Sequence, residues 1–410
     1  MEIQFLLAST ATEKRYLIYG WVRITAMQAS NYPTISTRFA LRPTQVEVDL
    51  EQITANHRAI QAHVGQAGVM PILKANAYGH GLVRVAQHLR DEGVRMLGVA
   101  YLEEGILLRE AGIRMPILVL GGILGSQAAT FIKHDLTLTA SSVQKLEQVE
   151  AAAAAAKTRA RVHLKIDTGM ERIGVHYYSA EALLEASLKC KHVLVEGIFS
   201  HFANADAADL SSANLQLERF QEVLSFYEKR SLPTPIRHMA NSGATLQLPD
   251  SWLDMVRPGI LMFGVYPSQE VQQTVAVQPA LRWTSRVVYF KVVRAGHPVS
   301  YGSTWQSDHD TRVVTIPVGY GDGYFRGMSN KAEVLINGSR YPVVGAICMD
   351  QFMVNIEQDS AYNEDEVVLV GASGDQRITV EDLAAWAGTI PYEVLTNINT
   401  RVPRIYKQDY

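Results

Sequence analysis

Short apolar runs alternate with longer segments of mixed polarity between residues 69 and 260. Runs of this kind, without a regular polar position, are typical of parallel strands buried on both faces. The runs are VMPILK (69–74), RMLGVA (95–100), PILVL (116–120), LTLTA (136–140), RVHLKI (161–166), VLVEGIF (193–199), IRHMA (236–240) and MVRPGI (255–260). Their number predicts an α/β fold in which a (β/α)8 barrel is favoured, with a doubly wound open sheet as the alternative.

The segments between these runs carry apolar residues at helical spacing. Ser211 and Ser212 are candidate N-caps for one of these helices, because a hydroxyl can accept a hydrogen bond from a first-turn amide. The alanine run 151–156 is expected to end another helix, since Ala has the highest helix propensity. The clearest segments are GLVRVAQHLRDEG (81–93), LEEGILLREAG (102–112), SSVQKLEQVEAAAAAAK (141–157) and SSANLQLERFQEVLSFYEKR (211–230).

The pattern changes after residue 278, where short strands are separated by Gly, Pro and Asn-Gly. Asn337-Gly338 between two apolar stretches predicts a β-hairpin. The stretch TVEDLAAWAG (379–388) predicts one helix. We therefore expect an N-terminal extension at residues 1–44, poorly ordered, a (β/α)8 barrel at 45–277, and a mostly β C-terminal domain at 278–410.

Composition narrows the functional classes. The 410 residues are 47% hydrophobic and 19% charged, which suffices for a sizeable core, and the net charge of -3 gives no reason to expect nucleic acid. With two cysteines, Cys190 and Cys348, a reducing and therefore cytoplasmic location is expected. No apolar run approaches the roughly 18 residues that a membrane span needs, so no membrane association is expected.

The first apolar run ends in Lys74, a residue that is costly to bury without a partner. Taken alone, such a lysine is most simply a side chain that reaches solvent from a strand end. Polar residues also end other runs, and in a barrel these ends form one functional rim, so a shared site is predicted. These residues are Lys74, Tyr78, Lys165, Asp167, Arg172, His201, Asp206, Asn241, Ser242, Arg257 and Gly259.

The residue types at this rim suit a ligand with an aldehyde and a phosphate. A lysine of lowered pKa can form a Schiff base with a carbonyl, and Ser242 with Gly259 suits a phosphate. Pyridoxal 5'-phosphate carries both groups. The glycine signature of a dinucleotide site and the lysine signature of a nucleoside-triphosphate site do not occur in a matching context. No metal site is predicted.

The motif ILKANAYGHG (72–81) closely resembles the cofactor motif of the alanine racemase family. The resemblance continues through KIDTGMERIG, SHFANAD, ANSGA, VRPGI, VSYG, PVGYGDG, GAICMDQFM and RVPRIY, and covers residues 43–406. It implies a pyridoxal-phosphate barrel of fold type III. It also implies interconversion of L-alanine and D-alanine by two bases, which would supply D-alanine for peptidoglycan.

The resemblance further implies a role for each matching residue. Lys74 would hold the cofactor and act as the base on the D-face of the substrate, with Tyr301 as the base on the L-face. Arg257 would hydrogen-bond the pyridine nitrogen with support from His201, and Arg172 would lie near the cofactor phenolate and the substrate carboxylate. The phosphate would be held by Tyr78, Ser242, Gly259, Ile260 and Tyr392, with Asn241 also at the cofactor.

Three further features follow from the same resemblance. Tyr301 and Met349 would enter from the other subunit, which implies a homodimer with shared sites. Lys165 would be carbamylated, and the new anion would hold Arg172 in place. The alternative is an ordinary contact between Lys165 and Asp167, whose side chains share a face at this spacing. The chain departs from the family at Ala346, where an arginine is usual, which predicts weaker attraction of the alanine carboxylate.

Other functions stay open on the sequence. A racemase of serine or of a wider amino-acid set would use the same residues. A non-catalytic pyridoxal-phosphate carrier would need Lys74, but it has no use for Tyr301 or a β domain. A decarboxylase of basic amino acids would pair a similar barrel with a β domain, but it would need an acidic group for the distal amine and a catalytic cysteine.

Overall fold

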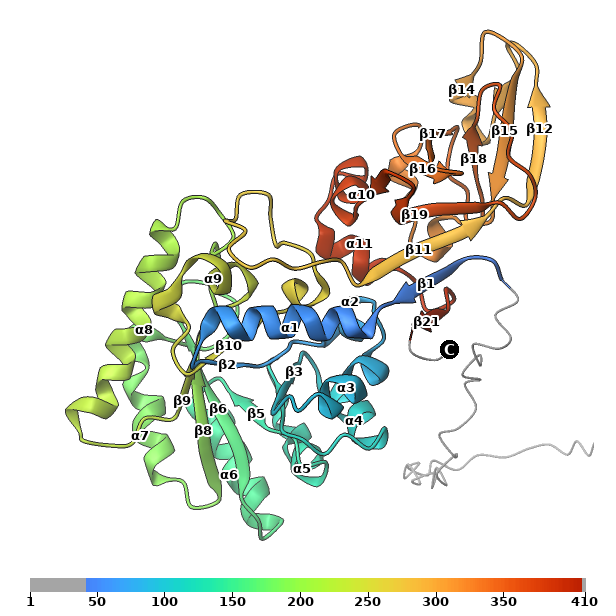
Figure 1. The fold of residues 1–410 in the computed structure, drawn as a ribbon. Helices are drawn as coiled ribbons and strands as arrows, with labels where there is room; N and C mark the ends of the chain where they lie inside the picture. Colours follow the sequence, from blue (N-terminus) through green and yellow to red (C-terminus); the bar gives the residue numbers. More distant parts are fainter. Residues whose placement is uncertain (1–41, 408–410) are drawn as a thin grey trace, which may run out of the picture.

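The computed structural model describes residues 42–407. The predicted extension at residues 1–44 lies almost wholly outside the described residues. The described chain forms an N-terminal region surrounded by helices and a C-terminal region built mainly of strands (Figure 1). Strands β1 (Gln45–Val48) and β11 (Leu281–Arg286) run side by side where the two regions meet.

The N-terminal region is a closed barrel of parallel strands. Hydrogen-bonded neighbours follow the order β2-β10-β9-β8-β6-β5. A bridge between Leu118 and Thr137 leads to the pair β4 and β3, and a bridge between Ile72 and Gly98 returns to the first run. The bounds are β2 (Gly68–Val69), β3 (Leu97–Val99), β4 (Ile117–Val119), β5 (Leu138–Ala140), β6 (Ala160–Asp167), β8 (Val193–Phe199), β9 (Ile236–His238) and β10 (Met255–Val256). Each strand overlaps a predicted apolar run, so the barrel is confirmed and the open sheet is wrong.

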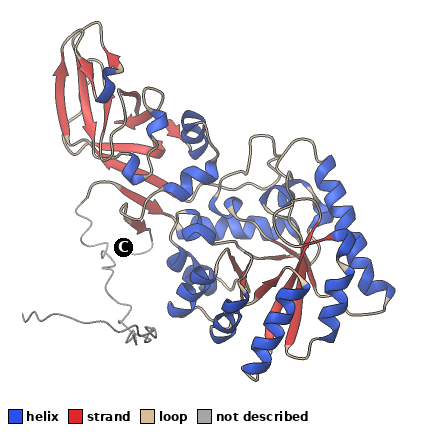
Figure 2. Cartoon of the chain, turned by 180° about the vertical axis from the view of Figure 1, so that it is seen from behind, coloured by secondary structure: helices blue, strands red, loops and turns tan. Residues whose placement is uncertain are grey.

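Helices cover the outside of the barrel (Figure 2). The run of alanines closes α6 as expected, but Ser211 and Ser212 do not cap α8. Ser211 is already helical, and its hydroxyl donates to Oδ1 of Asp209 at 2.6 Å instead of accepting from the helix. The barrel helices are α1 (Leu50–Val64), α2 (Lys74–Tyr78), α3 (Leu82–Asp91), α4 (Leu102–Glu110), α5 (Ala128–Lys133), α6 (Val143–Ala155), α7 (Glu181–Lys189), α8 (Ser211–Lys229) and α9 (Ser242–Gln247), with the short strand β7 (Val175–His176) beside β6.

The C-terminal region is a sheet in the order β12-β15-β18-β17-β16-β19-β11-β1-β21, with β20 beside β19. The predicted hairpin joins β16 and β17, and both turn residues, Asn337 and Gly338, have the positive φ that a two-residue hairpin requires. The predicted helix is α10 (Val380–Ala387), which Thr379 caps. The remaining elements are β12 (Tyr289–Val293), β13 (Pro298–Val299), β14 (Trp305–Gln306), β15 (Thr311–Ile316), β16 (Glu333–Ile336), β17 (Ser339–Val344), β18 (Phe352–Asn355), β19 (Glu366–Ser373), β20 (Gln376–Ile378), α11 (Pro391–Asn397) and β21 (Arg404–Tyr406).

Strand β1 belongs to the C-terminal sheet although it precedes the barrel in the chain. It pairs antiparallel with β11 and parallel with β21. One continuous apolar cluster contains Val46 of β1, Leu50 of α1 and Trp283 of β11, so the two regions share a core. The predicted division into two domains, residues 45–277 and 278–410, therefore stays a prediction. Among residues 42–407, no helix is both long enough and apolar enough to cross a bilayer.

Candidate active site

A cavity of about 400 Å³ opens at the carboxyl ends of the barrel strands. Its volume falls within the range of small-molecule sites, about 300 to 1,000 Å³. Most of the predicted site residues line it: Lys74, Tyr78, Lys165, Arg172, His201, Asn241, Ser242, Arg257, Gly259 and Tyr392. Ile260 is fully buried directly after Gly259 and does not line the cavity. The structure thus gathers residues that are as far apart as 74 and 392 in the sequence.

The turn that carries Lys74 has an unusual backbone. Residues 75–78 all have φ near +50°, a left-handed conformation that costs a side-chain-bearing residue about 1 to 2 kcal/mol. Such a turn persists only where the surroundings fix it. Here Oε1 of Glu104 accepts from the Ala75 amide at 2.7 Å, and Oδ1 of Asn76 accepts from the Leu82 amide at 2.9 Å. These contacts fix the turn, and the turn places Lys74 in the lining of the cavity.

The environment of Lys74 favours its neutral form. Burial lowers the pKa of this lysine, the nearby Arg172 lowers it further, and Glu104 opposes them. A neutral amine is the form that attacks a carbonyl and the form that can accept a proton.

Arg257 lines the cavity and is almost fully buried, with 4% of its surface exposed. Its Nη2 donates to the carbonyl oxygens of Ser200 and Met239 at 2.8 and 3.0 Å, and to Nδ1 of His201 at 3.1 Å. Among the described residues, its hydrogen-bond partners include no carboxylate. Burial lowers the pKa of Arg257 to about 9, so the group remains a cation at neutral pH.

Two buried histidines extend the contacts of Arg257 into the barrel. Its Nη1 donates to Nδ1 of His238 at 3.0 Å, so the other nitrogen of His238 is the donor to Nδ1 of His163, at 2.7 Å. Burial lowers the pKa of His163 to about 3, and burial followed by repulsion from Arg257 lowers the pKa of His238. Both rings are therefore neutral and fixed in one tautomer, which orients the guanidinium.

Lys165 is buried between cations. Burial, then repulsion from Arg257 and Arg172, lowers its pKa well below the usual value, with Asp167 opposing. Its Nζ donates to the Ile166 carbonyl at 3.3 Å and lies 4.9 Å from the centre of the Phe199 ring.

The carboxylate of Asp167 points to the following turn rather than to Lys165. It accepts from the amides of Gly169, Met170, Glu171 and Arg172 at distances of 2.8 to 3.2 Å. The simple Lys165–Asp167 ion pair does not occur among the described contacts.

Another part of the cavity lining combines hydroxyl groups with close backbone approach. Oγ of Ser242 accepts from the Gly259 amide at 3.0 Å, and the ring of Tyr78 lies 6.1 Å from that of Tyr392. A Cβ at Gly259 would stand 2.2 Å from the Tyr78 hydroxyl, so only glycine fits there. Asn241 caps α9 by accepting from the Ala244 amide at 3.0 Å.

Tyr301 and Met349 do not line this cavity. Both lie in the C-terminal region and are exposed, at 71% and 54% of their surfaces. Tyr301 instead lines a separate hollow with Cys348 and Ser300. One chain therefore holds the lysine, the cations and the hydroxyl groups together, but not the predicted second base.

Ala346, where the chain departs from the family, lies inside the described structure and not on its surface. Ala346 is buried, with 5% of its surface exposed, and its carbonyl accepts from Ser300 at 2.6 Å. The predicted effect of Ala346 on capture of the substrate carboxylate stays a prediction.

Several contributors to the site were not predicted from the sequence. His163 and His238 lie in predicted strands, and Glu104 opens a predicted helix. The signal for His163 was present in RVHLKI, because His163 and Lys165 alternate and so face the same side of the strand. His238 and Glu104 had no local signal, since only the fold brings them to Arg257 and to the Lys74 turn.

Comparison with known proteins gives the same picture as the geometry. Residues 48–267 match the family model for the alanine racemase N-terminal domain, and residues 280–406 match that for the C-terminal domain. The chain belongs to the alanine racemase family.

Solved and curated members of the alanine racemase family align along nearly their whole length. The alanine racemase of Carboxydothermus hydrogenoformans is 45% identical over 368 residues, which are 89% of this chain and 100% of the relative. The alanine racemase from D-cycloserine-producing Streptomyces lavendulae has a TM-score of 0.85 at 38% identity, covering 89% of this chain and 97% of that one. The Bacillus anthracis enzyme with bound L-Ala-P has a TM-score of 0.84 at 34% identity, covering 90% and 96%.

Proposed function

We propose that this member of the alanine racemase family interconverts L-alanine and D-alanine, with pyridoxal 5'-phosphate as its cofactor. The observation that carries the proposal is the single cavity that joins Lys74, Arg257 and the pair Ser242 and Gly259. Conversion of L-alanine into D-alanine would supply D-alanine for peptidoglycan. The two cysteines, Cys190 and Cys348, are free thiols, which supports a cytoplasmic location.

The residues present fit this cofactor. Gly259 leaves room that a Cβ would fill, next to the hydroxyls of Tyr78 and Ser242, which suits a phosphate. Lys74, with its lowered pKa, suits the aldehyde. Arg257 meets only neutral partners in the described structure, so its guanidinium can donate to a further acceptor such as a ring nitrogen. When bound, the cofactor supplies an electron sink that acidifies the α-proton of the amino acid.

The proton chemistry is assigned to two residues on opposite faces of the α-carbon. Lys74 accepts or returns the proton on the D-face, because its pKa is lowered toward the working range. Arg257 keeps its own proton, so it would donate a hydrogen bond to the ring nitrogen without protonating it. The backbone of Arg172 is held by its amide, which donates to Oδ2 of Asp167 at 3.2 Å, and its guanidinium would orient the substrate carboxylate. His201 accepts from Arg257 and supports its position.

The second base, Tyr301, is assigned to the partner subunit of a homodimer, together with Met349. The support for this proposal is their exposure in a single chain and their absence from the lining of the Lys74 cavity. Each homodimer then contains two composite sites.

The experiment that tests the function is incubation of the purified protein, loaded with pyridoxal phosphate, with L-alanine, followed by chiral chromatography. Appearance of D-alanine up to an equal mixture is expected, and its absence with full cofactor content would contradict the proposal. L-serine in a parallel reaction tests a wider substrate range. Loss of cofactor absorbance after borohydride in the wild type, but not in Lys74→Ala, tests the lysine independently of turnover.

Solvent exchange separates the two bases. Tyr301→Phe is expected to keep exchange of the α-proton of D-alanine with deuterated water, because Lys74 remains, and to lose exchange from L-alanine. Proton nuclear magnetic resonance measures both rates. Equal loss of both exchanges in a folded, cofactor-loaded variant would remove Tyr301 as the base on the L-face.

A further inference from the structure

One short segment near the C-terminus, residues 401–406, contacts two loops that carry different parts of the site. One loop, residues 348–350, contains Met349. The other is the left-handed turn that follows Lys74. The two loops lie in different regions of the chain, so this segment can set the position of both.

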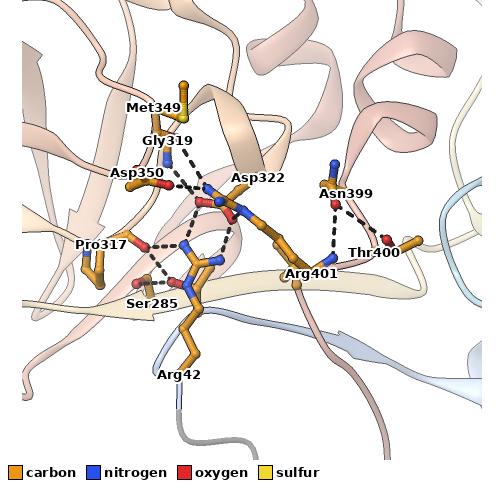
Figure 3. A network of polar contacts seen from close by, with 12 residues as sticks. Arg42, Ser285, Pro317, Gly319, Asp322, Met349, Asp350, Asn399, Thr400 and Arg401 are labelled. Atoms are coloured by element: carbon orange, nitrogen blue, oxygen red, sulfur yellow. Dashed lines mark hydrogen bonds and ion pairs between the residues drawn. The ribbon is translucent and has the colours of Figure 1, made fainter. Parts of the chain in front are cut away.

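Arg401 holds the 348–350 loop (Figure 3). Its Nε donates to Oδ1 of Asp322 at 2.6 Å, and its Nη2 donates to Oδ1 of Asp350 at 2.8 Å and to the Met349 carbonyl at 3.3 Å. The guanidinium thus joins the carboxylate of Asp322, which lies outside the loop, to the Asp350 carboxylate and the Met349 carbonyl of the loop. A point charge on a lysine could not reach all three with the same geometry.

Asp322 is the fixed point of this network (Figure 3). Its side chain is fully buried, and it also accepts from both terminal nitrogens of Arg42 and from the Gly319 amide at 3.0 Å. Burial alone would raise the pKa of this carboxyl, but the hydrogen bonds from Arg42 and Arg401 outweigh it and hold the pKa below its usual value. The carboxylate therefore stays ionised and anchors both guanidinium groups.

The turn that contains Asp322 packs directly on the 348–350 loop. The amides of Tyr320 and Gly321 donate to the carbonyls of Cys348 and Met349 at 3.1 and 2.9 Å. A Cβ at Gly319 would stand 2.3 Å from both of these carbonyl oxygens, so the two loops are in direct contact and leave no room for a side chain there. The position of Met349 is therefore set by Asp322 and Arg401.

Arg404, three residues further along, holds the Lys74 turn. Its Nε donates to the Gly79 carbonyl at 2.9 Å, while Nη2 donates to the Ile398 carbonyl at 2.7 Å. The hydroxyl of Tyr406 donates to the His80 carbonyl at 3.2 Å. A Cβ at Gly81 would stand 1.9 Å from that hydroxyl. These contacts fix the end of a turn whose backbone is otherwise unfavourable.

We propose that Arg401 and Arg404 are positioning residues for the two halves of the site. Arg401, through Asp322, positions the 348–350 loop, which the subunit lends to the cavity of its partner. Arg404 positions the Lys74 turn of its own cavity. The proposal rests on the proposed function, because the loop acts on substrate only in a composite site.

Single variants test whether the two arginines act on different steps. Arg401→Gln is expected to raise the KM for alanine about tenfold, the cost of losing charge-assisted hydrogen bonds, with cofactor affinity unchanged. Arg401→Lys should restore part of the loss, because one ion pair can re-form. Arg404→Gln is expected to weaken cofactor binding about tenfold, with the KM at saturating cofactor unchanged. Arg230→Gln, which removes surface ion pairs from the residue after α8 to Glu181 and Glu185 of α7, is the matched control and should change neither value.

A second variant keeps the test readable if Arg401→Gln loses stability. Asp350→Asn changes a side chain with 61% exposure and weakens only the outer contact of Arg401, because it removes the charge of the acceptor. It should raise the KM in the same direction as Arg401→Gln, by a smaller factor. Parallel rises in KM and cofactor dissociation constant for both arginine variants would overturn the proposal.

Mixed dimers assign each effect to a subunit. When Lys74→Ala and Tyr301→Phe subunits pair, the intact site takes Lys74 from the second subunit and the 348–350 loop from the first. Arg401→Gln should raise the KM only on the Lys74→Ala subunit, and Arg404→Gln should weaken cofactor binding only on the Tyr301→Phe subunit. The reverse assignment would overturn the positioning roles. A mixture without any restored activity would instead contradict the composite site of the proposed function, and the split between KM and cofactor affinity in the single variants would then decide the inference.

Discussion

The mouth of the barrel and the outer surface of the C-terminal region contrast in burial and charge. In the barrel cavity, the Arg257 cation and Lys165, whose pKa is lowered, are buried without a carboxylate hydrogen-bond partner in the described structure and are held by neutral rings and carbonyls. On the C-terminal region, Tyr301 and Met349 are exposed. A buried excess of positive charge suits an anionic ligand, whereas an exposed phenol acts as a base only where something covers it. The comparison supports the proposal that each chain contributes to two different sites of a dimer.

The largest expected effect comes from separating these half-sites genetically. Lys74→Ala and Tyr301→Phe should each lower racemisation by at least about a hundredfold, since each removes a base. When the two inactive proteins are dissociated together and reassociated, about half of the dimers are mixed, and each mixed dimer has one intact site. Roughly a quarter of wild-type activity should return, measured as D-alanine formed per milligram.

The control is each variant dissociated and reassociated alone, which should stay inactive. If mixing restores nothing while mass spectrometry of the intact dimers shows mixed dimers, Tyr301 serves its own chain, and the contrast between the two regions has another cause.

The next effect concerns Lys165. Its lowered pKa favours the neutral amine, the form that carbon dioxide carbamylates, and Arg172 is close enough to influence it. We expect Lys165→Ala to lose about tenfold or more in activity, the cost of a missing charged hydrogen-bond partner. Added acetate should restore part of it by replacing the carbamate anion. Arg230→Gln assayed with acetate controls for a general salt effect.

Absence of rescue in folded, cofactor-loaded Lys165→Ala would count against the carbamate. Mass spectrometry of the wild type under carbon dioxide gives an independent reading, because a carbamate adds a carboxyl group to one lysine.

A smaller effect is the acid sensitivity of the barrel. His163 is neutral in the folded chain because burial lowers its pKa to about 3, whereas in the unfolded chain it has an ordinary value near 6.5. Its contribution to stability is therefore complete above pH 6.5 and is lost as the pH falls toward 3. The loss is up to about 1.4 kcal/mol for each pH unit.

Urea unfolding at pH 7, 6 and 5 measures how the free energy of unfolding changes with pH. His163→Gln should reduce this pH dependence, and the amide oxygen of the new glutamine can still accept from His238. His309 of the C-terminal region provides the opposite case. Hydrogen bonds that His309 donates to the carboxylates of Asp308 and Glu357 raise its pKa, so its protonation favours the folded state at low pH. An unchanged slope in His163→Gln would mean that the ring is not buried as a neutral group.

The sequence predicts the barrel well because each strand is a local apolar run. It also predicts most of the cavity, since strand ends of a barrel converge whatever the details of packing. The resemblance to a family supplied the roles of individual residues, which periodicity could not.

Contacts that depend on the tertiary fold could not be predicted. The left-handed turn after Lys74 has no glycine within residues 75–78 to mark it, and the surrounding contacts of Glu104 and Arg404 fix it. Likewise β1 looks like a strand of the barrel region by position, but its partners are β11 and β21, which follow it by more than two hundred residues. The error at Ser211 was local, because Asp209 competes for the same hydroxyl.

The smallest expected effect asks whether the two regions also differ in stability. Ser142 caps α6 in the barrel and Thr379 caps α10 in the C-terminal region, each by accepting from an amide at 3.1 Å. Replacing either by Ala should cost about 1 kcal/mol. Because Val46, Leu50 and Trp283 belong to one continuous core, both variants should shift a single thermal transition by a similar few degrees without changing KM. Calorimetry measures the transition, and two separate transitions, each shifted by one variant only, would show that the regions unfold independently and differ in more than function.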